Sequence, residues 1–421
     1  MNRSQAAFKV REQLVRFLGI FSPHFSKPTM KFLGDMLYGL QASKDVKLSC
    51  IGRGLDEGIL LKKTEERLSR HLEREGIGEG ISRAIAIEGA KHVGKDTLLV
   101  IDPTDIRKLY ARRMPYLATI RDGSRKEKGV GYWACAAVAC ESGGHRILPL
   151  HLRLWSCQSP EFRSENEEIR EVVRAVQAAT KKRGIYVIDR GGDRGDFFSL
   201  FLDNELRFIV RLVGDRNLLW RHRPILAADL ASKCRIQYTE IIRRETEEGE
   251  KGYPIQYGVL PVKLPGRDEP LRLVVVRGLA EKPMLLLTDL ALTESRESLW
   301  QVVEGYLSRW RVEDAIRFIK QSYRLEDIRL LEYRRLQNMM AIVLATVFFA
   351  SVWLGESVRR GILVGNITRV SKRLFGVVEF HYYALADGIA TLFRRYGSWH
   401  GPGRSALPDS RQPELPFFAS G

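Results

Sequence analysis

The stretch from Ser295 to Arg324, SRESLWQVVEGYLSRWRVEDAIRFIKQSYR, carries the residues on which the fold and the chemistry of this chain depend. It contains no proline, and Ser295 followed by Glu297 supplies a helix cap and an anion for the first turn. These features predict a single helix of about eight turns.

Four side chains of different chemistry lie on one face of this predicted helix. They are Tyr306, Arg309, Glu313 and Lys320, and at about 100° per residue they fall within a stripe roughly 60° wide. A carboxylate with cations and a phenol on either side, over ~21 Å of helix, suits a metal ligand flanked by phosphate-binding groups. A solvated face, in which Glu313 pairs with Arg309 and Arg317, explains the same pattern.

The spacing of the four residues resembles a known signature. Tyr306-x2-Arg309-x3-Glu313-x6-Lys320 matches, at every position, the Y-x2-R-x3-E-x6-K motif of the DDE transposases of bacterial insertion sequences, in the large fourth insertion-sequence family. The resemblance implies an α/β fold with a ribonuclease-H-like catalytic core in which Glu313 is the last of three acidic metal ligands. It therefore calls for two aspartates upstream.

Two short apolar runs upstream each end in an aspartate. TLLVI at 97–101 precedes Asp102, and GIYVI at 184–188 precedes Asp189. Continuous apolar runs are typical of strands buried on both faces, so both aspartates are predicted at strand ends, with Glu313 packed across them. Three converging carboxylates repel one another unless cations are bound. Asp102, Asp189 and Glu313 are therefore the predicted catalytic residues and metal ligands, holding two Mg²⁺ ions that Mn²⁺ can replace.

Each aspartate also has an ordinary structural explanation. Asp102 precedes a proline and could end its strand in a turn. Asp189 begins an acid-rich loop in which Asp193 or Asp196 could serve as a helix cap. The resembling family often has D-R-E-A-D where this chain has DRGGD at 189–193, a departure that keeps both aspartates and changes the residues between them.

Further residues are predicted to contact DNA phosphates. The resemblance implies that Tyr306, Arg309 and Lys320 grip the 5′ end of a DNA strand, and Arg211 matches a family arginine on a core strand. Arg190 lies in the loop after the second apolar run. Weaker candidates, because surface cations are usually only solvated, form a basic run: Arg107, Lys108, Arg112, Arg113, Arg121, Arg125, Lys126 and Lys128.

Composition and charge agree with a large protein that has a polyanionic partner. The 421 residues are 44% hydrophobic, enough for a large core, and 68 basic against 51 acidic residues give a net charge of +17. Five cysteines without a C-x-x-C pair favour reduced thiols in an intracellular protein. The N-terminus lacks the apolar run of a secretion signal, so a cytoplasmic, nucleoid-associated bacterial protein is expected.

One apolar run invites a membrane interpretation. MMAIVLATVFFASVWL at 339–354 is 16 residues long, whereas a bilayer-spanning helix needs about 20. A buried core helix is the better prediction.

Changes of pattern along the chain predict six segments. They are a helical DNA-binding domain at 1–95, the first part of the core at 96–213, an all-β insertion at 214–283, the second part of the core at 284–335, C-terminal helices at 336–397 and a flexible tail at 398–421. The first segment looks separate from the rest. Within it, a helix pair carrying Lys47 and Arg53 suits a DNA major groove, although most such pairs are merely packed.

The order of elements predicted for the first part of the core is βββαβαβ. The strands are expected at 97–101, 131–140, 146–155, 184–188 and 207–213, and the helices at 161–182 and 197–204. The second and third strands should pair antiparallel. A further strand, MLLLTDL at 284–290, is expected to return to the core after the insertion.

The expected function is cut-and-paste transposition by a homodimer acting on the terminal inverted repeats of its element and on target DNA. The resemblance implies a hairpin intermediate with a flipped base stacked on an aromatic side chain. This chain has Met284 where such a tryptophan can stand, and Trp300 is a doubtful substitute because it lies about 120° from Tyr306 around the helix. A DNA-binding protein that no longer cuts is the alternative, and a plain ribonuclease-H-like nuclease leaves the other stripe residues unexplained.

Overall fold

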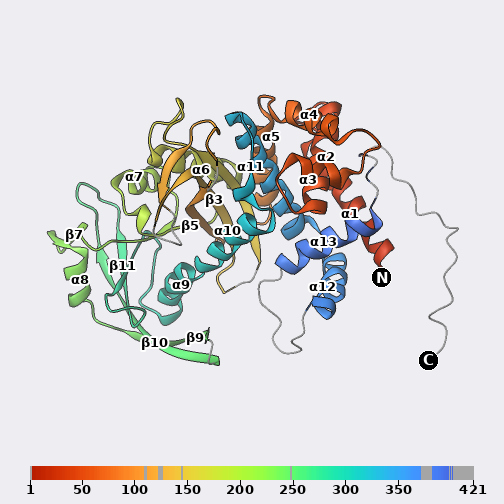
Figure 1. The fold of residues 1–421 in the computed structure, drawn as a ribbon. Helices are drawn as coiled ribbons and strands as arrows, with labels where there is room; N and C mark the ends of the chain where they lie inside the picture. The colour runs from red at the N-terminus through yellow and green to blue at the C-terminus, as the bar shows by residue number, and fades with distance from the viewer. Residues whose placement is uncertain are drawn as a thin grey trace, which may run out of the picture.

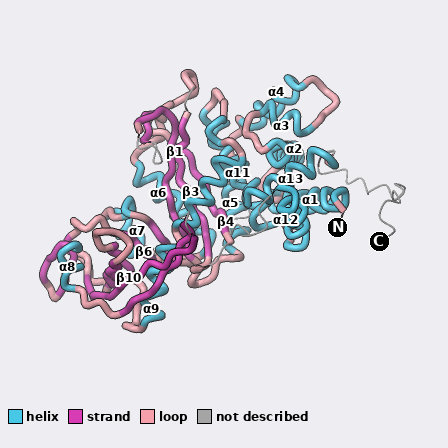
Figure 2. The backbone as a smooth tube through the Cα atoms, turned by 60° about the horizontal axis from the view of Figure 1, so that its bottom comes forward, coloured by secondary structure: helices cyan, strands magenta, loops and turns pink. Residues whose placement is uncertain are grey.

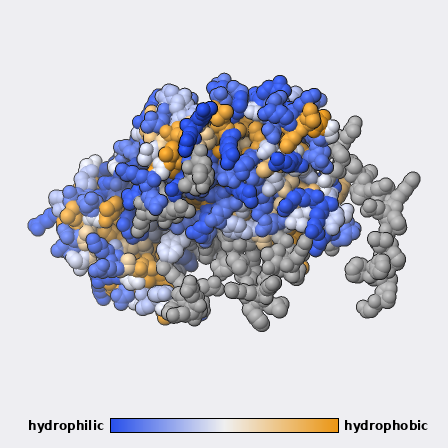
Figure 3. Space-filling model, in the orientation of Figure 1, coloured by the Kyte–Doolittle hydropathy of each residue, from blue (hydrophilic) through white to orange (hydrophobic). Residues whose placement is uncertain are grey.

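The computed structural model describes residues 2–108, 111–121, 127–143, 146–246, 249–370, 382–397, 399 and 401. Over these residues one ten-stranded sheet runs through one side of the molecule, and helices from both ends of the chain gather on the other side (Figures 1 and 2). The sheet order is β2-β3-β1-β5-β6-β12-β11-β10-β9, with β4 paired to β3. Most of the face seen in Figure 3 is hydrophilic.

The first part of the sheet matches most of the predicted strands and helices. Its elements are β1 Leu98–Arg107, β2 Ala118–Arg121, β3 Lys128–Cys140, β4 Ile147–Trp155, α6 Glu165–Thr180, β5 Ile185–Ile188, α7 Gly195–Asp203 and β6 Phe208–Arg211. β3 pairs antiparallel with β1 and β4, while β5 is parallel to both β1 and β6. The mixed sheet confirms the α/β prediction and adds β2, which the sequence analysis did not find.

The sequence predicted that the first strand ends at Asp102, but in the structure the strand continues past this residue. β1 stays paired with β3 as far as Arg107, but its pairing with β5 stops at Val100. Asp102 therefore lies within a strand, at the point where the neighbouring strand has already ended. A continuing antiparallel partner keeps the backbone extended past an aspartate and a proline that look like a strand end in the sequence.

The segment at 214–283 is not all β. It contains the hairpin β7 Asn217–Trp220 and β8 Arg223–Leu226 and the helix α8 Ala227–Lys233, followed by β9 Tyr238–Thr246, β10 Gly249–Val262 and β11 Leu271–Arg277. β12, Met284–Thr288, pairs with both β11 and β6, so the later strands extend the core sheet. Since all five residues of β12 are buried, the strand favours partners on both sides.

The prediction of a single long helix from Ser295 is wrong. The structure has α9 Arg296–Leu307 and α10 Trp310–Ser322, separated by a turn at Ser308 and Arg309. Ser308 Oγ donates to the carbonyl oxygen of Glu304 at 2.8 Å, and the Arg309 amide donates to Tyr306 at 3.1 Å, one residue short of the α-helical partner. Serine hydroxyls compete for helix carbonyls and bend helices in this way.

Helices from the two ends of the chain form one layer. The N-terminal helices are α1 Arg3–Leu18, α2 Lys27–Ser43, α3 Leu48–Leu55, α4 Leu61–Leu72 and α5 Ile77–Ala90, and the C-terminal ones are α11 Tyr333–Phe348, α12 Glu356–Val370 and α13 Tyr382–Tyr396. α11 packs on α2, α5 and β4, and α13 packs on α1 and α2 (Figure 1). Residues 1–95 therefore share a core with the C-terminal helices, whereas the sequence suggested that they stand apart.

The apolar run at 339–354 is a core helix, as predicted. Together with its π-helical extension at Phe349–Trp353, α11 is long and apolar enough to cross a membrane, but 83% of the apolar window is buried inside the molecule. In the predicted flexible tail, Trp399 is packed: its ring stacks on Tyr38 at 4.8 Å and its Nε1 donates to Asp35 at 2.8 Å. The rest of the tail, from 402 to 421, lies outside the described residues.

Candidate active site

Parallel strands place the two predicted aspartates opposite each other. The three residues of β1 from Leu98 to Val100 pair with β5 residues 87 positions later in the sequence (185 − 98 = 87). The same offset carries Asp102 to Asp189, because 102 + 87 = 189. Equivalent positions on neighbouring strands are about 5 Å apart with side chains on the same face of the sheet. The two carboxylates thus lie side by side where β5 ends.

Arg211 continues this row on the next strand. β5 and β6 pair with an offset of 22 residues (208 − 186 = 22), and 189 + 22 = 211. Asp102, Asp189 and Arg211 therefore occupy corresponding positions on three adjacent parallel strands. Arg190 is exposed in the short 3-10 turn Arg190–Gly192 that follows Asp189.

Arg309 links the strand acids to the helix acid. Its guanidinium lies 3.3 Å from Asp102 Oδ1 and 2.7 Å from Glu313 Oε1, and its Cζ is 5.9 Å from the centre of the Tyr306 ring. Only 8% of Arg309 is exposed. The Arg309–Glu313 ion pair allowed by the sequence is formed: its Glu313 side chain is 48% exposed, whereas its Arg309 side chain is buried against Asp102. Arg317 pairs with Asp314 instead of Glu313.

The pKa of Asp102 reports how crowded these charges are. Burial raises it to about 7; the Arg309 guanidinium opposes this rise, while Asp189 and Glu313 add to it. Both other acids are therefore close enough to repel the Asp102 carboxylate. A group of acids in this position needs positive charge to be fully ionised.

The donor set fits a hard divalent cation. Three carboxylates supply the oxygen ligands that Mg²⁺ and Mn²⁺ prefer. Among the described residues, however, no three acidic, histidine or cysteine side chains are grouped closely enough to hold a metal ion as they stand. Arg309 lies between two of these acids, where it contacts Asp102 and Glu313.

The alternatives to Asp189 in the DRGGD loop have other partners. Asp193 accepts a hydrogen bond from the Val213 amide at 2.8 Å and pairs with Arg216. Asp196 accepts hydrogen bonds from side chains of α6. Asp189 itself accepts a hydrogen bond from the Gly191 amide at 2.8 Å, so it both caps the 3-10 turn and belongs to the row. The two glycines that replace E-A in the family motif lie in that turn.

Several predicted phosphate contacts are occupied by protein groups. Lys320 Nζ donates to the Asp105 carbonyl oxygen at 2.7 Å, and Lys47 pairs with Asp327 at 2.8 Å. Lys108 is 4% exposed, which excludes it from a DNA-facing surface. Arg125 and Lys126 of the basic run lie outside the described residues.

One exposed aromatic residue was missed by the sequence analysis. Trp310 is 48% exposed and precedes Glu313 by three residues on α10, a spacing that places both on one side of a helix. This spacing was available in the sequence. Met284, by contrast, is 5% exposed within β12, and Trp300 packs against Tyr257, with 5.9 Å between the ring centres.

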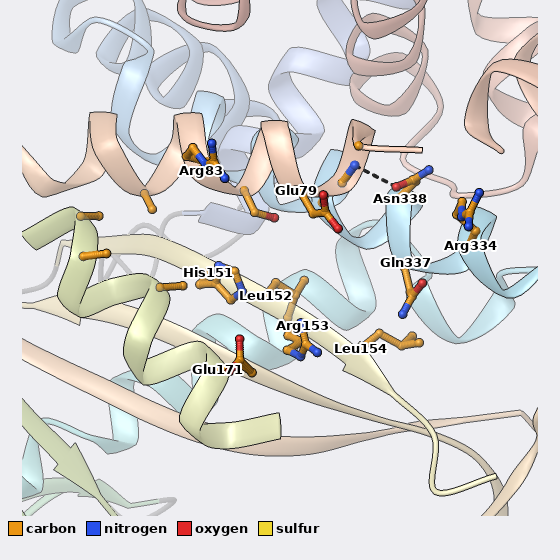
Figure 4. A pocket seen from close by; sticks show the side chains of 18 of the residues that line it. Glu79, Arg83, His151, Leu152, Arg153, Leu154, Glu171, Arg334, Gln337 and Asn338 are labelled. Carbon is orange, nitrogen blue, oxygen red and sulfur yellow. Dashed lines mark hydrogen bonds between the residues drawn. The ribbon is translucent and has the colours of Figure 1, made fainter. Parts of the chain in front are cut away.

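A large cavity lies away from the acids. It has a volume of about 750 Å³ and opens between α5, α6, α11 and β4, with Arg83, His151 and Gln337 among its lining residues (Figure 4). Burial lowers the pKa of His151 to about 4. The acids of the row contribute no side chain to the lining of this cavity.

Comparison with known proteins places the chain in a family. No curated protein matches it. A solved structure described as a piggyBac transposase synaptic complex with hairpin DNA aligns with a TM-score of 0.41 and 11% identity, over 93% of this chain and 81% of that one. The family model described as "Transposase DDE domain" matches residues 94–349, more than half of the chain and all of the acids described above. The chain therefore belongs to the transposase DDE domain family.

Proposed function

We propose that this protein is a DNA transposase in which Asp102, Asp189 and Glu313 hold two divalent metal ions, Mg²⁺ by preference, with Mn²⁺ able to replace it. The observation that carries the proposal is the placement of the three acids: Asp102 and Asp189 are in register on neighbouring strands, and Glu313 is linked to Asp102 through Arg309. A ribonuclease-H-like core is part of the proposal, and the mixed sheet with Asp102 and Asp189 on neighbouring parallel strands supports it.

The chemistry divides between the metals and the protein. When bound, the ions activate a water molecule or a 3′-hydroxyl and stabilise the leaving oxygen of an in-line displacement. The protein presents two carboxylates from rigid strands and one from α10. Arg309 on the helix side, with Arg190 and Arg211 on the strand side, binds the DNA phosphates around the acids. Of the other two residues predicted to contact phosphate, Tyr306 is 1% exposed and Lys320 is hydrogen-bonded to Asp105, so both face protein groups in this structure.

Membership of the fourth insertion-sequence family is part of the proposal, because the stripe from Tyr306 to Lys320 matches its signature. The substrate is then the terminal inverted repeats of the protein's own element together with target DNA, handled by a homodimer on the bacterial nucleoid in a cut-and-paste reaction. The hairpin route needs an aromatic platform for a flipped base. Trp310, exposed beside Glu313, is a better platform than the buried Met284.

Cleavage of DNA ends tests the proposal. Glu313→Gln should abolish Mg²⁺-dependent cleavage of duplexes that carry the element's ends and leave DNA binding largely unchanged, because a neutral amide of the same shape is a poor metal ligand. Glu297→Gln, an exposed change in the first turn of α9, should cut like the parent protein. Cleavage retained by Glu313→Gln would show that the acid does not bind the metals.

A non-cleaving DNA-binding protein is the second candidate, and one contact favours it. Arg309 already pairs with both Asp102 and Glu313 and offsets part of their charge without metal. The same assay separates the two functions. A parent protein that binds the ends tightly but cuts them in neither Mg²⁺ nor Mn²⁺ has lost the transposase reaction.

A further inference from the structure

The turn that follows the Glu313 helix is held by a buried lysine. Lys108, one residue past the end of β1, donates from Nζ to the carbonyl oxygens of Glu326 and Ile328 at 2.6 and 2.5 Å. Glu326 belongs to the 3-10 turn Leu325–Asp327, which begins three residues after α10 ends. Burial lowers the pKa of Lys108 to about 8. Burying an ammonium group is costly unless it is hydrogen-bonded, and here the two carbonyl oxygens supply the hydrogen bonds that the Lys108 ammonium needs.

A second lysine makes a parallel connection one turn earlier. Lys320, in the last turn of α10, donates to the carbonyl oxygen of Asp105 on β1 at 2.7 Å. Asp102, Asp105 and Lys108 follow one another along the same strand. The contacts at Asp105 and Lys108 therefore fix the position of α10 along the direction of β1. They thereby fix where Glu313 lies relative to Asp102.

The same turn contacts the N-terminal helices. Lys47, at the start of α3, pairs with Asp327 at 2.8 Å, and the Val46 amide donates to the Tyr323 carbonyl oxygen at 3.1 Å. The Tyr323 hydroxyl donates to Gln41 Oε1 of α2 at 3.3 Å. The end of α10 thus lies between β1 and the N-terminal helical layer, and Lys108 supports it from the β1 side.

We propose that Lys108 is a positioning residue that fixes the Glu313 helix against the Asp102 strand, and that its role is not to bind phosphate. The strand acids are placed by sheet register alone, whereas Glu313 depends on the anchoring of α10. Loss of the Lys108 ammonium leaves two carbonyls unsatisfied and frees the end of α10 to move along β1. The consequence for metal binding rests on the proposed function, but the consequence for α10 does not.

Hydrogen–deuterium exchange and Mn²⁺ binding test this role in the full-length protein. In Lys108→Met, which keeps the length of the side chain and removes its donors, amides of residues 310–322 should exchange about tenfold faster. Mn²⁺ affinity, followed by electron paramagnetic resonance, should fall by roughly tenfold, the usual effect of losing a residue that orients a metal ligand. Amides of α1 should keep their protection. Lys182→Met, which removes an exposed lysine paired with Glu205, is the control and should change neither property.

Two further variants keep the test decisive. If Lys108→Met does not fold, Lys108→Gln, whose amide can still donate, should give an intermediate increase in exchange at 310–322. Asp327→Asn, which weakens the contact with Lys47 and leaves Lys108 in place, should loosen α10 less than Lys108→Met. Unchanged exchange at 310–322 in a folded Lys108 variant would overturn the proposal. A different outcome is that the parent protein binds no Mn²⁺ while the Lys108 variant still exchanges faster at 310–322. That outcome would contradict the proposed function and leave the positioning role intact.

Discussion

Arg309 has two roles that one side chain cannot fill at the same time: it pairs with the acids, and it is predicted to bind DNA phosphate. It lies between Asp102 and Glu313, where it offsets the repulsion of the acids, yet the sequence signature assigns it to DNA phosphate. A guanidinium has five donors in a rigid fork and can move from a carboxylate to a phosphate without losing its hydrogen bonds. Divalent metal, which neutralises the acids, would release Arg309 for DNA. Under the proposed function, loading the site with metal would thus exchange one cation for another.

Removing Arg309 should destabilise the metal-free protein. Arg309→Ala removes the partner of Asp102, which is largely buried, and of Glu313, which is half exposed, so the free energy of unfolding should fall by about 2 kcal/mol. Mn²⁺ should then raise the melting temperature more in the variant than in the parent, since the ion replaces the missing charge. Thermal unfolding with and without Mn²⁺ measures both effects. Arg317→Ala, which removes an exposed partner of Asp314, is the control. Equal melting temperatures for Arg309→Ala and the parent without metal would contradict this account.

At the scale of elements, the register of the sheet positions most of the residues of the candidate site. β1, β5 and β6 are short parallel neighbours, and their offsets align Asp102, Asp189 and Arg211. β4 is separated from β5 by two strands, β3 and β1, and its His151 faces the large cavity instead of the acids. Burial of His151, with a smaller effect from the Arg153 charge, lowers the pKa of the ring and so favours its neutral form.

His151 should contribute to acid unfolding. Burial lowers its pKa from 6.5 to about 4, so between these values the unfolded chain binds a proton that the folded chain does not. Stability from this group is therefore present above pH 6.5 and is lost as the pH falls towards 4. The urea midpoint, measured at steps between pH 7 and 4, should fall less steeply for His151→Gln than for the parent. Identical slopes would mean that His151 keeps its ordinary pKa in the folded protein.

At the scale of the whole molecule, the two ends of the chain depend on each other. The Phe17 ring of α1 lies 6.1 Å from that of Phe348 and 5.5 Å from that of Phe349, at the end of α11. Trp399 lies on Tyr38 of α2. The predicted N-terminal DNA-binding segment therefore cannot be removed without exposing the apolar face of the C-terminal helices.

Deleting residues 1–70 should thus disrupt folding as well as end recognition. The truncated chain should aggregate on size-exclusion chromatography and lose exchange protection over residues 333–353, because α2, one of the elements that cover α11, is gone. Deleting residues 402–421 leaves every contact described above in place, and that shorter chain should remain monodisperse. A stable, monodisperse chain lacking residues 1–70 would show that the first helices form a separable domain, and its preference for element ends could then be measured directly.

The sequence by itself determined what depends on local patterns. Apolar runs before Asp102 and Asp189, and the spacing from Tyr306 to Lys320, follow from strand and helix periodicity and pointed to the transposase family. The tertiary structure decided what depends on contacts between distant residues. The burial of Lys108 beneath the turn after α10 and the shared helical layer arise from partners far away in the chain, and no local pattern encodes them. The break at Ser308, by contrast, uses a hydrogen bond to Glu304 only four residues earlier. A lysine looks the same in the sequence whether water, DNA phosphate or two backbone carbonyls surround it, because only the fold selects its neighbours.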